Sequence, residues 1–282
     1  MEKFNLKVSN LSLKYYGGYL GVDMVSFEAN SSFAILGKAM SGKTSLLRCI
    51  ANVESYQGEI TTSAKDIAFT FDLNSLKKNK SVKENIAIPL KLRKIEHIDE
   101  IVLKQAKLFH IESILDKQVK DISLSEKRLT ILARALIRPA DLYLLDDPLK
   151  DVEDREKYFE ILFELIKDKN VIYSTTKLEE ARRFNSMLLM AYKKAVGFGA
   201  MEDILKEPKT IDVLKLLTDY TYENIEIKKE KDYYIEYLDK KHVVPKPISD
   251  IYVNKEVVFA KAENVILDMY FDKSTEYLVS TR

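Results

Sequence analysis

One stretch of eight residues constrains the fold more than any other part of the chain. It runs from Gly37 to Thr44, reads Gly-Lys-Ala-Met-Ser-Gly-Lys-Thr, and fits the pattern G-x-x-x-x-G-K-S/T. The apolar run before it, Ser32–Leu36, is typical of a strand, and Ser45–Ile50 after it is typical of a helix. A strand, a tight glycine-rich turn and a helix N-terminus with free N–H groups form the context in which this pattern binds phosphate. We therefore predict a phosphate-binding loop rather than an incidental glycine turn.

The residue types in this loop each have a role in phosphate binding. Gly37 and Gly42 allow the backbone to curl around the phosphates, Lys43 reaches the β- and γ-phosphates, and the Thr44 hydroxyl ligates Mg²⁺. The residues expected to contact the bound molecule are Gly37, Lys38, Ala39, Met40, Ser41, Gly42, Lys43, Thr44 and Ser45.

Composition limits the class of protein. The chain has 282 residues, 46% of them hydrophobic, which is enough for one large domain or for a domain of roughly 200 residues with a smaller appendage. Its 45 basic and 44 acidic residues leave a net charge of +1, so we expect no nucleic acid partner. No run approaches the ~18 uninterrupted apolar residues of a membrane span, and Met1–Asn5 carries no apolar signal segment. The single Cys49 excludes an internal disulfide framework, and we expect a buried thiol.

Hydrophobic periodicity predicts alternating strands and helices. Because the predicted strands are largely apolar along their length, we expect a parallel sheet covered on both faces. Strands are expected within 3–36 and at 58–61, 66–71, 142–148 and 170–174, and helices at 41–52, within 81–118, from Ser123 to Pro139 and at 155–167. Within 81–118 the apolar helix faces carry Val82, Ile86, Leu90, Ile101 and Leu108.

A carboxylate at the tip of a strand points to a larger family. Asp146 ends an apolar strand while the phosphate loop follows another, as in a P-loop NTPase, where the carboxylate holds Mg²⁺ beside the loop hydroxyl. Further motifs resemble those of the ATP-binding subunit of an ABC transporter. They are Leu132–Leu136 followed by Pro139, Leu144–Leu149, Tyr16-Gly17 before Val25–Phe27, and Val82-x-Glu84-Asn85-Ile86. The resemblance covers residues 4–217 well and the remainder loosely.

The resemblance implies a fold and a division into domains. Residues 1–218 are expected to form an ATP-binding domain: a P-loop NTPase parallel sheet with an N-terminal antiparallel β subdomain and a helical subdomain at about 75–135. Residues 222–282 are rich in Tyr, Val and Ile with short alternations, so we expect a small, barrel-like regulatory β domain at 219–282. The segment Gly199–Ile204 with Pro208 is similar to the linker of the sugar-importer branch, which carries such a domain.

Roles implied by the resemblance place ATP and Mg²⁺ at the loop. Tyr16 would stack on the adenine ring, the alternative being that this tyrosine packs locally. Lys43 and Thr44 keep their phosphate and metal roles, and Asp146 ligates Mg²⁺ with Thr44. Ser123 is the second residue of the signature segment, Ile122–Glu126, which in the family closes over ATP held by the opposing subunit.

Four positions of the nucleotide site depart from the family pattern. Met40 replaces a loop glycine, and Asp72 replaces a glutamine but stays a candidate ligand of Mg²⁺ or of its water. Asp147 replaces the catalytic glutamate and is shorter by one carbon, about 1.5 Å. Thr176 replaces the switch histidine, and a hydroxyl cannot supply an imidazolium-like contact to the γ-phosphate. Because a base misplaced by about 1 Å can cost on the order of a hundredfold in rate, we expect both catalytic positions, Asp147 and Thr176, to be impaired.

The signature segment departs as well. It is L-S-G-G-Q in the family and reads Ile-Ser-Leu-Ser-Glu here, so Ser123 survives while Leu124 and Ser125 replace two glycines. Those glycines let N–H groups approach the γ-phosphate. The alternative interpretation is a helix capping box and nothing more. The D-loop that follows, Lys150–Glu153, is also unusual.

These observations predict an ATP-binding subunit of an ABC-type importer with slow or absent ATP turnover. It would dock through its helical region onto transmembrane permease subunits and so lie peripherally on the cytoplasmic face of the membrane. It would form a homodimer, or a heterodimer with a second ATPase subunit. Two alternatives stay open: a non-hydrolysing sensor or regulatory half of a heteromeric complex, and a P-loop kinase.

Overall fold

A six-stranded sheet lies at the centre of the structure. The computed structural model describes residues 4–217, 221–237, 240–244, 247, 252–253, 255–262 and 265–280. The strand order is β5-β6-β7-β3-β8-β9, and neighbouring strands are parallel except for β9, which is antiparallel to β8. The strands are β3 (Phe33–Leu36), β5 (Ile67–Phe69), β6 (Leu142–Asp146), β7 (Val171–Thr175), β8 (Ser186–Ala191) and β9 (Lys194–Ala200).

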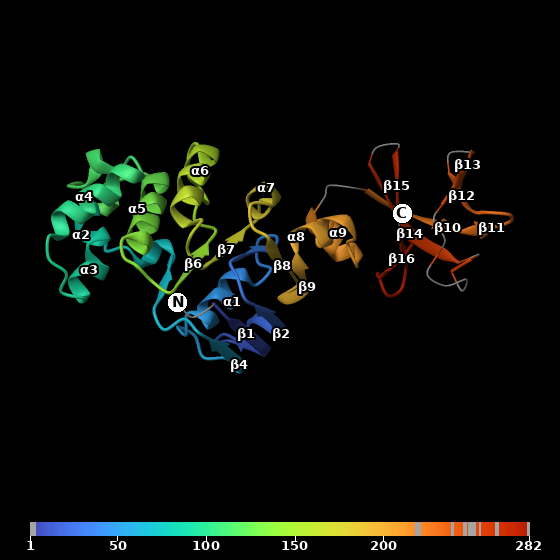
Figure 1. The fold of residues 1–282 in the computed structure, drawn as a ribbon, viewed down its shortest axis with the longest axis horizontal. Coiled ribbons are helices and arrows are strands. Elements are labelled where there is room, and N and C mark those ends of the chain that lie inside the picture. The colour runs from blue at the N-terminus through green and yellow to red at the C-terminus, as the bar shows by residue number, and fades with distance from the viewer. Residues whose placement is uncertain are drawn as a thin grey trace.

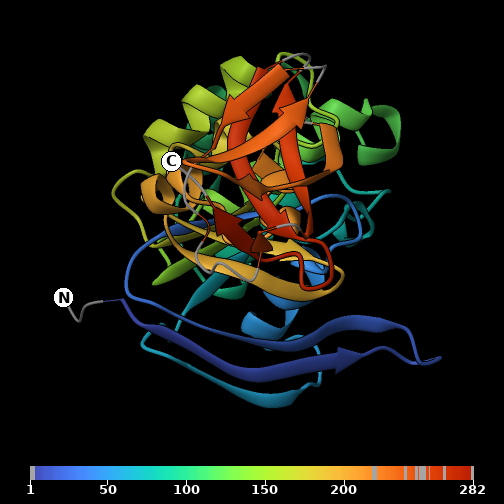
Figure 2. The same cartoon turned by 90° about the vertical axis from the view of Figure 1, so that its right-hand side faces the viewer.

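One face of this sheet packs against a second, antiparallel sheet and helix α1 (Lys43–Ile50). The second sheet has the order β2-β1-β4 and forms a separate layer below the parallel sheet (Figure 2). Side chains of α1 join the same buried cluster as both sheets, among them Leu46 and Leu47. The antiparallel strands are β1 (Leu6–Lys14), β2 (Leu20–Ala29) and β4 (Gln57–Thr62).

Helices cover the opposite face. The alternation of buried side chains along β3 divides them between the two cores, with Phe33 and Ile35 facing α1 and Ala34 and Leu36 facing the other side. The predicted parallel sheet with two covered faces is therefore confirmed. The remaining helices are α2 (Val82–Ile86), α3 (Ile88–Leu92), α4 (Ile98–Leu108), α5 (Leu124–Leu136), α6 (Arg155–Ile166), α7 (Leu178–Ala181), α8 (Met201–Lys206) and α9 (Ile211–Leu217).

Helices α2 to α5 gather at one end of the molecule (Figure 1). Val82, Ile86 and Leu90 are buried as their spacing predicts. The expectation for Leu108 was wrong, because this side chain is 37% exposed. Helix α4 instead turns Val102 towards the core, together with Ala106 one turn later.

The C-terminal strands form two further sheets at the other end (Figure 1). Strands β10 (Thr221–Glu226), β14 (Glu256–Ala262), β15 (Val265–Asp272) and β16 (Leu278–Ser280) make one, and β11 (Lys228–Lys229), β12 (Tyr233–Tyr237) and β13 (Lys240–Val243) make the other. The predicted boundary at residue 218 lies outside the described residues. Helix α9 belongs to two cores: Val213 and Leu217 pack with the helices of the parallel sheet, whereas Ile211 and Leu214 pack with the C-terminal strands.

Within the described ranges, every helix is too short or too polar to cross a bilayer.

The environment of Cys49 predicts an unreactive thiol. Cys49 is buried on α1, and burial, with a smaller contribution from Glu54, raises the pKa of its thiol to about 12. Since the thiolate is the nucleophile, alkylation by iodoacetamide at pH 8 should be at least ~1,000-fold slower in the folded chain than in the urea-unfolded chain. Comparable labelling rates in the two states, followed by mass spectrometry, would contradict this burial.

Candidate phosphate-binding site

The predicted site residues meet at one edge of the parallel sheet. The phosphate loop follows β3, Asp146 ends β6 with Asp147 directly after it, and Thr176 follows β7. Strands β6, β7 and β3 are adjacent and parallel, so their carboxyl ends lie side by side, where open α/β sheets bind ligands. Asp72 follows the neighbouring strand β5 and lies at the same edge.

Lys43 is the buried cation of the loop. Its Nζ donates to the carbonyl oxygens of Gly37, at 2.7 Å, and Lys38, at 3.0 Å. Burial lowers the pKa of Lys43, while the nearby carboxylates of Asp147 and Asp146 act in the opposite direction. The loop thus holds a desolvated ammonium group whose direct partners are neutral carbonyls, and a bound phosphate would supply its counter-charge.

The two motif glycines are required by the geometry of the loop. A Cβ atom on Gly37 would lie 2.4 Å from Ser41 Oγ and 2.5 Å from the Met190 carbonyl oxygen. Gly42 is the N-cap of α1 with φ 106°, in the left-handed region that side chains other than glycine rarely adopt.

The loop forms with Met40 in place of the family glycine. Met40 has φ 62° and is 85% exposed, so its side chain extends into solvent. Its carbonyl oxygen accepts a hydrogen bond from Lys193 Nζ, and the Lys193 amide donates to the Ser41 carbonyl at 3.1 Å. The turn between β8 and β9 therefore supports the loop from outside.

A buried hydroxyl tests whether the loop fits a phosphate. Ser41 Oγ is inaccessible to solvent and has no hydrogen-bond partner among the described residues. The N–H groups of the first turn of α1 have no acceptor within the helix either. An orphaned hydroxyl and free amides in one loop are what a phosphate would satisfy, so the residues present fit the group. Exposed Thr44 and half-buried Asp146 offer the oxygen ligands that Mg²⁺ prefers.

Neighbouring hydroxyls bind the Asp146 carboxylate and the backbone amides of Asp146 and Asp147. Ser174 Oγ donates to Asp146 Oδ1 at 2.7 Å and accepts from the Asp147 amide at 3.0 Å. Thr70 Oγ1 accepts from the Asp146 amide at 2.7 Å. Neither Ser174 nor Thr70 belongs to a motif; their only sequence signal is a hydroxyl where a strand ends.

Asp147 is engaged by a cation that no motif indicated. Its Oδ1 accepts a hydrogen bond from Arg155 Nη2 at 3.0 Å. Arg155 is the first residue of α6, where the helix dipole disfavours a positive charge. This unfavourably placed charge is the feature of the sequence that could have indicated a specific contact for Arg155.

Asp72 and Thr176 are placed differently from each other. Asp72 is half-exposed; its Oδ1 accepts from the Asn74 amide at 2.8 Å and its Oδ2 from Arg48 Nη2 at 2.9 Å. A metal at Asp72 would therefore compete with a guanidinium. Thr176 is exposed beyond the end of β7. The roles of both residues stay predictions.

The two adjacent tyrosines of the β1–β2 loop, Tyr15 and Tyr16, have different environments. Tyr15 donates a hydrogen bond to Ser45 Oγ at 3.1 Å and so ties this loop to α1. Tyr16 is fully exposed, at 105%, so the alternative in which it packs locally was wrong. Its ring is open to stacking, which stays a prediction.

Ser123 is not part of the loop cluster. It caps α5: its Oγ accepts from the Glu126 amide at 3.1 Å, and its own amide donates to Glu126 Oε2 at 2.7 Å. The predicted capping box is confirmed. Ser125 Oγ accepts from the amide of Glu153 at 3.1 Å, so the altered signature and the altered D-loop contact each other within the chain.

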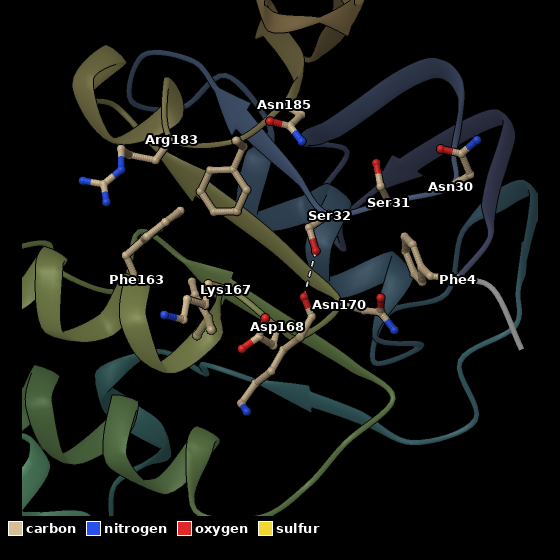
Figure 3. Close-up of a pocket in the computed structure, with 13 residues that line it drawn as sticks. Phe4, Asn30, Ser31, Ser32, Phe163, Lys167, Asp168, Asn170, Arg183 and Asn185 are labelled. Carbon is tan, nitrogen blue, oxygen red and sulfur yellow. Dashed lines mark hydrogen bonds between the residues drawn. The ribbon is translucent and has the colours of Figure 1, made fainter. Parts of the chain in front are cut away.

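A cavity elsewhere in the structure is lined by none of the motif residues. It has a volume of about 690 Å³ and lies by the amino ends of β3, β7 and β8, opposite the phosphate loop. Arg183, Phe163 and Lys167 border one side and Asn30 and Phe4 the other (Figure 3). We assign the functional site to the loop, because the buried ammonium and the orphaned hydroxyl are there.

Comparisons with known proteins bear on the family. A family model described as ABC transporter matches residues 22–150. The tungstate uptake system ATP-binding protein of Peptoclostridium acidaminophilum is 32% identical over 211 residues, which cover 68% of this chain and 96% of that protein. The chain belongs to the ABC transporter family.

Two further comparisons agree with this ABC-family assignment. The molybdate/tungstate import ATP-binding protein of Methanocaldococcus jannaschii is 33% identical over 229 residues, covering 75% of this chain and 76% of that protein. A solved inward-facing structure assigned to the metal-chelate type of ABC transporter has a TM-score of 0.62 at 20% identity, covering 86% of this chain and 98% of that one. The likeness to the solved structure supports the fold alone.

The crowding at Gly37 yields a stability prediction. Gly37→Ala should lower the free energy of unfolding by about 1–3 kcal/mol, because the new methyl group overlaps Ser41 and a backbone oxygen. Urea titration measures the change. Gly199→Ala in β9 is the matched control, since its nearest neighbours lie 4.0 Å away. If both variants lose the same free energy of unfolding, the close packing around Gly37 does not contribute to stability.

Proposed function

We propose that this chain is the ATP-binding subunit of an ABC importer. The observation that supports this most directly is the loop from Gly37 to Thr44, which holds buried Lys43 and a Ser41 Oγ with no hydrogen-bond partner among the described residues. The two relatives named above are ATP-binding proteins of uptake systems. Both the family and the loop therefore indicate ATP as the ligand.

We assign the nucleotide contacts as follows. Lys43 and the loop amides bind the β- and γ-phosphates, and the fully exposed Tyr16 stacks on adenine. Thr44 and Asp146 hold Mg²⁺, with Asp72 as a further candidate. When bound, Mg²⁺ offsets the negative charge of the phosphates. Ser174 and Thr70 keep Asp146 in place for this role.

A groove beside the helical region is a candidate docking site for the permease. It has a volume of about 620 Å³ and lies between β5 and helices α3 and α5. Phe71 and Leu92 line it and are 41% and 80% exposed. Apolar groups left in water at a groove mark an interaction site, and we propose that a transmembrane permease subunit docks here. The chain would then be held at the cytoplasmic face of the membrane.

Two classes of transported solute are considered, a sugar and an oxyanion. The assignment to the sugar-importer branch rests on Gly199–Ile204 and on the C-terminal strands, taken as a regulatory domain at 219–282 attached to an ATP-binding domain at 1–218. The two relatives described above carry names that refer to tungstate and molybdate. We therefore favour an oxyanion over a sugar.

We further propose that hydrolysis by this chain alone is slow. Asp147 is one carbon shorter than glutamate and is held by Arg155, and Thr176 cannot replace an imidazole. Leu124, which replaces a signature glycine, is 45% exposed at the start of α5, where a partner's nucleotide would approach. Such a chain could act as a feeble homodimer, as one half of a heterodimer with a competent ATPase, or as a sensor that binds ATP without turnover.

Nucleotide binding should depend on Lys43. We expect the purified chain to bind labelled Mg-ATP, and Lys43→Ala to weaken that binding at least tenfold, because a charge-assisted contact to phosphate is lost. Lys107→Ala, on the exposed surface of α4, is the control and should bind like the unaltered chain.

Two results would count against the proposal. If the unaltered chain binds no nucleotide, or if Lys43→Ala binds as tightly, the ATP-binding assignment is wrong. If bound ATP is hydrolysed in a single turnover as fast as by an ordinary transporter ATPase, only the slow-hydrolysis part fails.

Docking should depend on the apolar groove. Leu92→Asp is expected to reduce co-purification with the permease subunits several-fold, because a charge enters an apolar contact. Nucleotide binding should be unchanged, since Leu92 lies on α3, away from the phosphate loop. Leu103→Asp alters a leucine on α4 that is 42% exposed and does not line the groove, and it should leave both properties intact. Equal capture of both variants would place the permease elsewhere.

A further inference from the structure

Arg155 is anchored by hydrogen bonds from three of its side-chain nitrogens. Its Nε donates to Glu180 Oε1 at 2.5 Å and its Nη2 to Glu180 Oε2 at 2.9 Å, a bidentate pair between α6 and α7. Its Nη1 donates to the Leu149 carbonyl at 3.2 Å. Three nitrogens of the planar guanidinium are therefore fixed at once.

The anchor itself is rigid. Glu180 is only 6% exposed. Its Oε2 also accepts from Tyr173 Oη at 3.0 Å and from Thr175 Oγ1 at 2.6 Å. Tyr173 and Thr175 belong to β7, so the central sheet positions the carboxylate that positions Arg155.

From this anchor, Arg155 reaches the position of the catalytic glutamate. Nη2, the same nitrogen that contacts Glu180, donates to Asp147 Oδ1 at 3.0 Å. The side chains of Arg155 and Asp147 are 22% and 18% exposed, so water screens the pair weakly. Burial alone would lower the pKa of Arg155, but the carboxylates of Glu180 and Asp147 raise it above its ordinary value.

We propose that Arg155 is a positioning residue that restrains hydrolysis by holding the Asp147 carboxylate against α6. This rests on the function proposed above. In hydrolysis the water oxygen bonds to the γ-phosphorus as the bond to the bridging oxygen breaks, giving ADP, phosphate and a proton. A carboxylate that aligns this water must come within about 2.6–3.2 Å of it. The Asp147 side chain is one carbon shorter than that of glutamate. If it moved towards the γ-phosphate, Arg155 could keep its contact with Asp147 only by breaking its contacts with Glu180.

Removal of the restraint should therefore accelerate hydrolysis. Arg155→Gln keeps a donor for buried Glu180 but loses the charge that bridges to Asp147. In single-turnover experiments at saturating Mg-ATP, this variant should hydrolyse bound ATP about tenfold faster, the effect of one charge-assisted hydrogen bond. Its affinity for labelled Mg-ATP should stay within about threefold of the unaltered chain, so that the turnover rate changes and binding does not.

Two further variants keep the test decisive if Arg155→Gln does not fold. Arg155→Lys retains a positive charge for Glu180, and a single ammonium cannot span both carboxylates, so a smaller gain is expected. Arg183→Gln is the matched control: Arg183, two residues beyond the end of α7, pairs with exposed Glu160 of α6 at 2.5 Å, and its loss should leave turnover unchanged.

The restraint can also be detected without nucleotide. The Nε–H resonance of Arg155 should show slow exchange in the free chain and should shift when Asp147 is changed to asparagine, while the Glu180 contact persists. Intact nucleotide binding with no gain in rate for either Arg155 variant would overturn the restraint, as would a gain that survives in the Asp147→Asn background. Absence of nucleotide binding by the unaltered chain would instead overturn the proposed function.

Discussion

The parallel pairing of β6, β7 and β3 is the constraint on which the rest of the structure depends. The phosphate loop follows β3, and the carboxylates lie at the end of β6. This pairing brings the two to the same edge of the sheet, with β7 between their strands. The register pairs Asp146 with Ser174 and Leu36 with Thr175. A slip of one residue would turn every side chain to the opposite face, and the contact between Ser174 and Asp146 would be lost with it.

Much of this arrangement was readable from the sequence because its signals are local. The loop motif, the apolar strands and the capping box at Ser123 each depend on residues a few positions apart, and each is present in the structure. The helix faces were predicted less well. Leu108 has helical spacing but lies on a turn that the core does not reach, since a period defines a stripe and not what covers it.

The contacts that decide the chemistry were not predictable in the same way. Arg155 and Glu180 are 25 residues apart and meet only because α6 and α7 flank the same strand. The family pattern singles out Tyr16, yet it is Tyr15 that binds α1. The signature helix also contacts the D-loop: Ser125 Oγ accepts from the backbone amide of Glu153, and Arg128 pairs with Asp151 at 3.2 Å. These contacts are visible only once the chain is folded.

Helix α9 has a thermodynamic consequence of its own. It gives Val213 and Leu217 to one hydrophobic core and Ile211 and Leu214 to another, all nearly inaccessible to solvent. Neither core can melt without exposing half of this short helix, which has too few residues to persist in water unaided. Unfolding of either core therefore exposes apolar side chains of α9, which couples the stability of the C-terminal strands to that of the parallel sheet.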